Sequence, residues 1–247
     1  SLQNIIRNDL AWCRIRELDW KGGSTDFGRL LQSSNAVESP YNAVYAYETG
    51  ICLGAAGDLE AAMELIAGVE LFLESEAGEA KKEEYGPERY AREMAKALTH
   101  EQTSKEEFEM AALELIVLWD QWETMSEESA DKAVKLLENQ ADGARTRLLK
   151  GALQLASSKQ ETRNAGLSDL RQVETLEDDS LPASCPANGE HYKAFAQYIL
   201  GKELKKSGET SSIEEGNQLL QEVRSRGETQ PFHLYNILSF RLHATQD

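Results

Sequence analysis

The chain has 247 residues, of which 40% are hydrophobic and 28% are charged, and its formal net charge is −17. This composition is too apolar for a disordered protein, and the acidity disfavours binding to nucleic acid or to anionic membrane surfaces. No apolar run approaches the roughly 20 residues that cross a bilayer, and no basic and then apolar leader opens the chain, so we expect no membrane-spanning segment.

The cysteines and prolines give further information on the location and the structural class of the protein. The cysteines, Cys13, Cys52 and Cys185, are scattered and odd in number, which fits free thiols in a reducing compartment and predicts a cytoplasmic location. Only five prolines occur, and residues that favour helix dominate. The composition therefore predicts an all-α protein.

The first elements in chain order are two predicted helices. One covers residues 5–20, and we expect Gly22 and Gly23 to end it; its antiparallel mate covers residues 24–33. Pro40 then opens a third helix at its favoured first position. Tyrosines at helical spacing in this third helix are typical of a core rather than of a ligand site.

A helical hairpin is predicted next. Gly50, Gly57 and Ala62 fall at the spacing of the small residues in a tetratricopeptide hairpin. Gly50 would lie inside a helix, where glycine costs about 1 kcal/mol relative to alanine, so we expect a neighbouring helix to pass too close for a Cβ. Gly57 predicts a helix end, and Ala62 predicts the crossing point on the second helix, residues 58–73.

The middle of the chain combines a charged segment with an apolar one. Residues 74–84 are strongly charged, and we expect a subdivision of the domain near residues 74–86. Ser104 and Glu107 form a predicted capping box ahead of an apolar helix over residues 106–122. We expect that helix to be central and buried.

Two later segments repeat. Residues 151–173 and 201–223 align without a gap at an offset of fifty residues, and Gly208 is assigned as a further repeat position. The aligned pairs are Gly151 with Gly201, Gly166 with Gly216, Leu170 with Leu220 and Val173 with Val223. Such hairpins cannot bury their apolar faces singly and must stack. The earlier hairpin departs from the tetratricopeptide pattern at its turn, which has Ser158 and an insertion over residues 159–164.

Motifs of catalysis are missing from the sequence. It contains no HExxH, no glycine-rich phosphate loop, no GxSxG and no CxxC. The four histidines are distant from one another in sequence, and paired carboxylates occur throughout the acidic chain without a pattern. We therefore predict no enzymatic activity, no cofactor and no metal; a metal-binding helical bundle is the rival class, and it lacks the Glu-x-x-His pairs that such bundles use.

Several clusters occur together in one order. They are Ala11-Trp12-Cys13 with Asp19-Trp20, residues 39–53, residues 87–91, Ala112-Leu113-Glu114 with Trp119, residues 148–151 and residues 240–244. With them the chain resembles the C-terminal half of the tetratricopeptide repeat protein 39 family, which includes the fungal inclusion body clearance proteins. The resemblance implies a non-enzymatic cytosolic adaptor that clears inclusion bodies in cooperation with lipid droplets. It also implies a C-terminal fragment of a longer protein, located in the cytoplasm, and also in the nucleus or at lipid droplets.

We therefore predict an all-α, right-handed stack of antiparallel helical hairpins over residues 1–247 that acts as a protein-interaction scaffold. Its concave face would be formed by the first helices of the pairs, residues 41–53, 144–155 and 192–204. Partner contact is expected at Tyr41, Asn42, Arg145 and Lys193, and the acidity of the chain favours a basic peptide or protein. The alternative is a helical lipid-binding domain in which residues 113–118 line a cavity.

Overall fold

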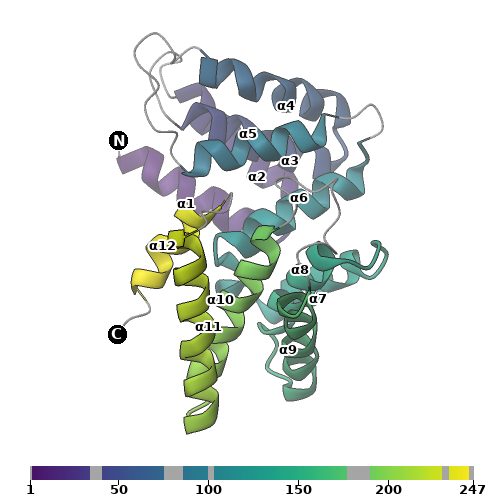
Figure 1. The fold of residues 1–247 in the computed structure, drawn as a ribbon. Coiled ribbons are helices and arrows are strands. Elements are labelled where there is room, and N and C mark those ends of the chain that lie inside the picture. The colour runs from purple at the N-terminus through teal and green to yellow at the C-terminus, as the bar shows by residue number, and fades with distance from the viewer. Residues whose placement is uncertain are drawn as a thin grey trace. The chain divides into compact units, whose positions relative to one another are not determined.

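The structure, a computed structural model, describes residues 2–33, 41–74, 86–99, 103–176, 190–229 and 234–244. All regular elements within these ranges are helices, as the composition predicts (Figure 1). The helices belong to two compact units, residues 1–129 and 130–247. Most of the charged segment 74–86 lies outside the described residues, so a subdivision there stays a prediction, as does the single domain.

Unit 1 is organised around α3. Its elements are α1 (Leu2–Arg16), α2 (Trp20–Ser33), α3 (Asn42–Ala56), α4 (Leu59–Glu74), α5 (Gly86–Leu98), α6 (Lys105–Leu118) and the short 3-10 helix η1 (Gln121–Thr124). Helix α3 packs against α2, α4, α5 and α6. The predicted apolar helix is α6, and all of its residues from Phe108 to Leu118 are buried, as expected.

The capping box at the start of α6 is confirmed. The backbone N–H of Ser104 donates to Glu107 Oε2 at 2.8 Å, and the backbone N–H of Glu107 donates to Ser104 Oγ at 3.4 Å. These two bonds satisfy donors that have no partner within the first helical turn. They fix the residue at which α6 begins.

The predicted end of the first helix is wrong. Helix α1 ends at Arg16, Leu18 adopts a left-handed conformation with φ 60°, and α2 already begins at Trp20. Asp19 Oδ1 accepts the backbone N–H of Gly22 at 2.9 Å, so this carboxylate starts α2 before the two glycines. Gly23 lies inside α2, where a Cβ would come within 2.6 Å of Ile15 Cγ2 on α1. The glycine therefore serves close packing rather than a helix end.

The hairpin of α3 and α4 matches its prediction. A Cβ at Gly50 would lie 2.9 Å from Ile66 Cδ1 and 3.4 Å from the carbonyl oxygen of Ala62, so the two helices cross where a side chain would not fit. Gly57 follows α3 with φ 97°, and its N–H donates to the carbonyl of Gly54 at 2.9 Å. Both glycines thus have the mechanical roles that their spacing indicates.

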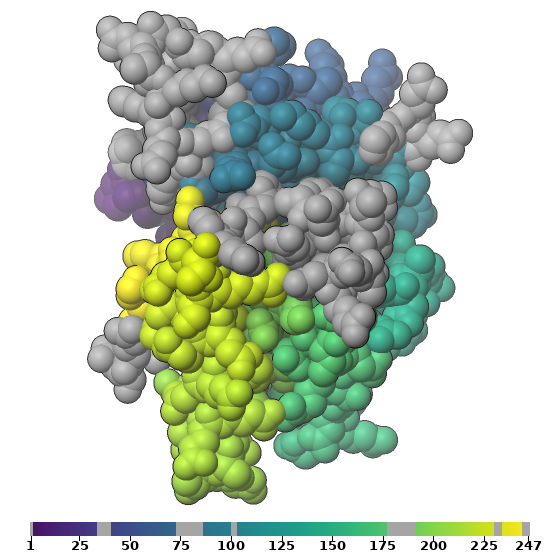
Figure 2. All heavy atoms as spheres, viewed as in Figure 1, coloured from purple at the N-terminus to yellow at the C-terminus, as the bar shows by residue number. Residues whose placement is uncertain are grey.

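Unit 2 contains the two matched hairpins. Its elements are α7 (Glu127–Leu137, which begins at the unit boundary), α8 (Ala144–Gln154), α9 (Gln160–Glu174), α10 (Glu190–Lys206), α11 (Thr210–Thr229) and α12 (Tyr235–Ala244). Helices α8 and α9 pair, α10 and α11 pair, and α10 packs against both α8 and α9. Helix α12 packs on α11 and α10. In Figure 2 the yellow-green atoms of α11 form a continuous column at the surface.

The fifty-residue repeat is a repeat of one helix crossing. A Cβ at Gly151 would lie 2.8 Å from Leu170 Cγ and 2.9 Å from the carbonyl oxygen of Gly166. At the equivalent crossing, a Cβ at Gly201 would lie 2.8 Å from Leu220 Cγ and 3.0 Å from the carbonyl oxygen of Gly216. Ala62 and Ile66 make the same contacts with Gly50, so three hairpins share one crossing.

The turns of the two matched hairpins differ. Gly208, with φ 78°, follows α10 as a left-handed residue, whereas α8 ends in Leu155 with a right-handed backbone. The turn after α8 has no left-handed glycine. Instead, Nη1 of Arg163 on α9 donates a hydrogen bond to the carbonyl oxygen of Leu155. The irregular turn predicted for this hairpin is therefore present, and an arginine satisfies the end of its first helix.

Arg163 also joins the two hairpins. Its Nη2 lies 2.7 Å from Glu203 Oε2 on α10, and Lys206 Nζ lies 2.6 Å from the other carboxylate oxygen of Glu203. Glu203 is buried, so two cations compensate a carboxylate that has lost most of its water.

None of the helices in the described ranges is long and apolar enough to span a bilayer.

Candidate interaction surface

Positive charge collects on the first helices of the two hairpins in unit 2. Helix α8 carries three Lys or Arg and no acid, and α10 carries four Lys and two Glu. The second helices are acidic, with net charges of −1 for α9 and −2 for α11. Since α8 and α10 contact each other, the basic helices of this very acidic chain are neighbours.

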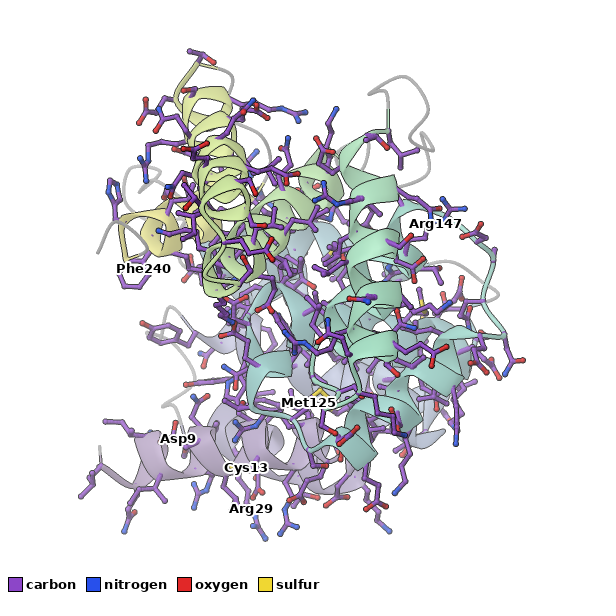
Figure 3. All side chains as sticks on the ribbon, turned by 90° about the horizontal axis from the view of Figure 1, so that it is seen from below. Asp9, Cys13, Arg29, Met125, Arg147 and Phe240 are labelled. Atoms are coloured by element: carbon purple, nitrogen blue, oxygen red, sulfur yellow. The ribbon has the colours of Figure 1, made fainter. Side chains whose placement is uncertain are left out.

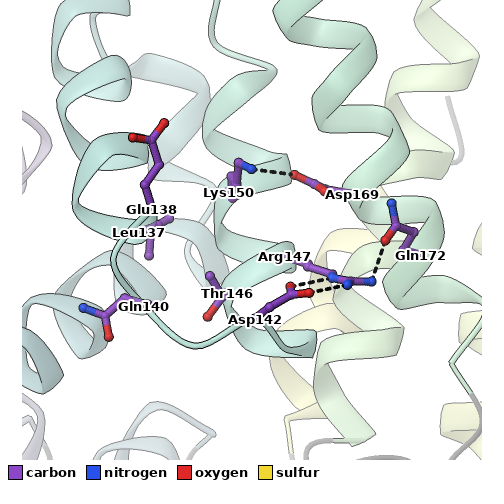
Figure 4. A pocket seen from close by; sticks show the side chains of 9 residues that line it. All are labelled: Leu137, Glu138, Gln140, Asp142, Thr146, Arg147, Lys150, Asp169 and Gln172. Atoms are coloured by element: carbon purple, nitrogen blue, oxygen red, sulfur yellow. Dashed lines mark hydrogen bonds and ion pairs between the residues drawn. The ribbon is translucent and has the colours of Figure 1, made fainter.

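A pocket of about 290 Å³ opens beside α8 (Figure 4). The end of α7, the loop after it, and helices α8 and α9 supply its lining. These residues are Leu137, Glu138, Gln140, Asp142, Thr146, Arg147, Lys150, Asp169 and Gln172. The lining is almost entirely polar, which suits the polar groups of a peptide more than a lipid chain.

Two ion pairs organise the pocket. Both oxygens of Asp142 accept hydrogen bonds from the Arg147 guanidinium, with Nε 2.7 Å from Oδ1, and Arg147 also donates to Gln172 Oε1. The hydrogen bond from Arg147 lowers the pKa of Asp142, so this carboxylate stays ionised. Lys150 Nζ lies 3.8 Å from Asp169 Oδ2. A bound acidic group would therefore compete with carboxylates of the protein for these cations.

The two predicted contact residues of unit 1 differ in exposure. Tyr41 immediately precedes α3 and is 45% exposed, and its ring lies 6.1 Å from that of Tyr45. Asn42 is only 4% exposed, which corrects the expectation that it faces a partner. The correction has a simple cause, because α3 is the central helix of its unit and most of its faces are covered.

The two predicted contact residues of unit 2 lie on neighbouring helices. Arg145 on α8 is half-buried, and Lys193 on α10 donates from Nζ to the carbonyl oxygen of Leu176, after α9, at 2.9 Å. Lys193 therefore has a role within the fold. A role in partner binding stays a prediction for both residues.

Most of α10 is not available for contact. Its residues from Ala194 to Leu200 are all buried, and Lys202 places its Nζ 5.0 Å from the ring centroid of Tyr198. The first helix of this hairpin thus offers little surface in its middle, and α8 is covered to a similar extent, since its three cations are half-buried and seven of its residues are buried. Arg147 and Lys150 were missed from the sequence, although three cations without an acid are an unusual run in this chain.

A buried acid lies on α3 of unit 1. Burial raises the pKa of Glu48 to about 8, and its Oε2 has no hydrogen-bond partner among the described residues. Burial also raises the pKa of the Cys52 thiol, one turn further along α3, and Glu48 adds to this effect. Cys52 is therefore an unreactive buried thiol rather than a nucleophile.

No group of His, Cys, Asp and Glu within the described ranges is arranged to hold a metal ion. His191 is buried beside the ring of Tyr192, with the ring centroids 4.0 Å apart. His100, His233 and Cys185 lie outside the described residues.

The lipid-binding alternative gains no support from the polar pocket. Its proposed lining, residues 113–118, is buried within the packed helix α6.

Comparison with known proteins identifies a family. The sequence model described as Iml2/Tetratricopeptide repeat protein 39 matches residues 1–176, which run from α1 to just beyond α9. The matched residues include the hairpins α3/α4 and α8/α9; the repeated hairpin α10/α11 and the cluster at residues 240–244 follow them. No solved structure matches the chain.

Proposed function

Because the chain belongs to the Iml2/Tetratricopeptide repeat protein 39 family, we propose that it is a non-enzymatic scaffold that binds protein partners. The observation that carries the proposal is the glycine crossing shared by the hairpins α3/α4, α8/α9 and α10/α11. Stacked hairpins of this kind build extended surfaces that hold peptides by side chains on one row of helices.

The part of that row in unit 2 that borders a pocket is α8. Arg145, Arg147 and Lys150 give this helix a positive charge, and the pocket is lined by polar side chains. An acidic peptide segment would bind these cations in competition with Asp142 and Asp169, which pair with Arg147 and Lys150. The proposal therefore assigns an acidic segment to α8, although the net charge of the whole chain favours a basic partner elsewhere on the surface.

The test is charge reversal on α8. The full chain with Arg145→Glu or with Lys150→Glu is used to capture partners from its own cells, and each recovered protein is quantified against the unchanged chain. We expect a loss of at least about tenfold in the captured partner, which corresponds to about 1.4 kcal/mol. Lys150→Glu also removes the ion pair with Asp169, and Lys193→Glu removes the hydrogen bond to Leu176, so a loss of capture by either is compared with its thermal unfolding.

The matched control is Lys159→Glu. This exposed lysine lies at the turn of the same hairpin, so the variant makes the same charge change away from the pocket. Thermal unfolding followed by circular dichroism establishes that all variants are folded. Equal capture by the α8 variants and by the control would refute the assignment to α8.

The resemblance to the fungal proteins supports a more specific role, clearance of cytoplasmic inclusion bodies in association with lipid droplets. The test compares cells that lack the protein with cells that express the unchanged chain or the Arg145→Glu variant. Fluorescent inclusions should persist in the first and third cases and disappear in the second. Equal clearance in all three would contradict the role.

A further inference from the structure

Helix α12 lies on a part of the last hairpin that the fifty-residue repeat does not explain. The offset matches Glu174, the last residue of α9, with Arg224 of α11. Helix α11 nevertheless continues to Thr229, and this additional part contains Gly227. Glycine is unfavourable inside a helix, and Gly227 takes no part in the glycine crossing of this hairpin. Gly227 therefore has a role outside the repeat.

The role of Gly227 is to accept the ring of Tyr235, the first residue of α12. A Cβ at Gly227 would overlap that ring, so only glycine allows the contact. The Tyr235 hydroxyl donates to the carbonyl oxygen of Arg224 at 3.3 Å. Near the end of α12, Nη2 of Arg224 donates at 3.0 Å to the carbonyl oxygen of Leu242, one of the carbonyls that a helix end leaves without an internal partner. Arg224 thus bonds to both ends of α12.

The apolar contacts of α12 follow a single stripe. Leu234, just before the helix, and Leu238 and Leu242 within it are buried and lie four residues apart. The helix packs on α11 and α10. We call the part of these two helices that α12 covers, with Gly227 and Arg224, the α12 docking surface. It fits one side of an amphipathic helix.

Helix α12 depends on this surface for its own stability. It has ten residues, fewer than an isolated helix needs in water. Six of them are Tyr, Asn, Ile, Ser, Phe and His, which favour helix less than Ala, Leu, Glu or Lys do. Phe240 is 80% exposed, on the outer side of α12 (Figure 3). A helix of stronger helix formers with the same contact residues would therefore compete with α12 for the surface.

We propose that the α12 docking surface is a binding site for a helix of a protein partner, and that α12 occupies it as an intramolecular competitor. The ligand is an amphipathic helix with an aromatic residue at i and leucine at i+3 and i+7, the spacing of Tyr235, Leu238 and Leu242. Its last carbonyls lie where Arg224 donates. The site is separate from the α8 surface, and the proposal stands if the assignment to α8 fails.

A second copy of the chain is a less well matched occupant. Exchange of α12 between two copies forms no contact with the docking surface that each copy does not already make. It also adds the entropic cost of association. A helix of a different protein lacks this limit, because its residues outside the contact are free to favour helix.

The experiment uses the full chain and a fluorescein-labelled peptide with the length of residues 234–244. The peptide keeps Leu234, Tyr235, Leu238 and Leu242, and its other positions carry Ala, Glu and Lys. Fluorescence anisotropy measures the affinity, and hydrogen exchange follows the backbone amides of α12. We expect the peptide to bind, and we expect exchange in α12 to increase at saturation because α12 is displaced.

The variants separate the competitor from the surface. Leu238→Glu combined with Leu242→Glu releases α12 from the surface, so the affinity for the peptide should rise at least about tenfold. Gly227→Ala, added to this double variant, blocks the contact with the aromatic ring and should lower the affinity at least about tenfold. Circular dichroism establishes that the variants are folded. If the double variant does not fold, Tyr235→Ala replaces it and should raise the affinity severalfold.

The matched controls are Phe240→Glu, on the exposed side of α12, and Gly68→Ala, inside α4, where a Cβ would meet nothing within 4 Å. Neither should change the affinity. The proposal would be overturned by equal affinity of the unchanged chain and the double variant, or by binding without increased exchange in α12. It would also be overturned by equal binding of a peptide with serine in place of the tyrosine. Dimers in light scattering that the double variant abolishes would identify a second copy as the occupant and would overturn it as well.

Discussion

The hairpins α3/α4 and α10/α11 have the same helix crossing, and each contains a buried carboxyl group. The surroundings of the two carboxyl groups differ. Glu48 on α3 has an oxygen without a hydrogen-bond partner among the described residues, and burial raises its pKa to about 8. Glu203 on α10 is also buried, but Arg163 and Lys206 lie 2.7 and 2.6 Å from its two oxygens. The first acid is therefore held neutral near neutral pH, whereas the second is paired with two cations.

The comparison shows that the two hairpins share the helix crossing but not the polar residues beside it. The glycine crossing sets the distance between the backbones of the two helices, and it recurs in both hairpins. The polar residues one turn or less from the crossing are not constrained in this way. The buried carboxyl of α3 is held protonated, whereas that of α10 is paired with two cations.

The largest effect is expected when Glu203 loses a cation. Arg163→Met removes the ion pair with a buried carboxylate and the hydrogen bond to Leu155, so the free energy of unfolding should fall by about 2–3 kcal/mol. Urea titration measures the change. Arg171→Met is the matched control, because Arg171 pairs with Glu215 at an exposed site and should contribute less than about 1 kcal/mol. Equal losses would show that Glu203 does not depend on Arg163.

A methyl group at the crossing should have the next largest effect. Gly201→Ala forces a Cβ to within 3.0 Å of the backbone oxygen of Gly216, which cannot move easily, and should cost about 2 kcal/mol. Gly50→Ala should cost less, because the nearest atom is the end of the Ile66 side chain and the Ala62 oxygen is 3.4 Å away. Urea titration compares the two variants, and the reverse order would contradict the difference between the crossings.

The buried acid of α3 should make stability depend on pH. The raised pKa means that folded protein keeps the Glu48 proton up to about pH 8, whereas the unfolded chain releases it near the ordinary value of 4.5. Stability should therefore fall as pH rises between these values. Glu48→Gln should remove this slope and be more stable than the unchanged chain by about 2 kcal/mol above pH 8, with little difference at pH 4.5.

Urea titration at several pH values measures that slope. Glu203→Gln is its counterpart on α10 and should destabilise the protein, since it leaves Arg163 and Lys206 facing a neutral amide. A Glu48→Gln variant that is less stable than the unchanged chain at pH 8.5 would contradict the neutral state of Glu48.

The smallest effects are expected at the glycines that end the first helices. Gly57 and Gly208 have φ of 97° and 78°, and a Cβ at either would meet nothing within 4 Å. Alanine at each should therefore cost only the left-handed conformation, about 1 kcal/mol in both hairpins. Gly68→Ala inside α4 is the control, since its Cβ also has open space and its backbone is helical; it should stabilise by about 0.5–1 kcal/mol. Unequal losses at Gly57 and Gly208 would show that the two helix ends differ.

The glycine spacings allowed the crossings to be predicted because a missing Cβ is a local property that a sequence records directly. The same is true of the capping box at Ser104 and Glu107. Gly22 and Gly23 predict the wrong end for the first helix, because the Asp19 carboxylate starts α2 and Gly23 allows contact with Ile15. The sequence alone does not distinguish a glycine that is needed for close packing from a glycine that is needed for a turn.

The candidate site was only partly predictable. Arg145 lies on the basic helix α8, but Arg147 and Lys150 join Asp142 and Asp169 only because the turn before α8 and the helix α9 fold back onto it. Asn42 is expected at a partner contact because it lies on the first helix of its hairpin, but the central position of α3 buries it. Burial depends on neighbours that are distant in sequence.

The sequence by itself determined the helical class, the glycine crossings and the family, because each depends on residue types and on short spacings along one chain. Only the tertiary structure decided which acids are buried and how they are compensated, since Glu48 and Glu203 are the same residue in different surroundings. It also decided that the first half of α1 turns its apolar residues outward. The orientation of a helix is set by what packs on its other side.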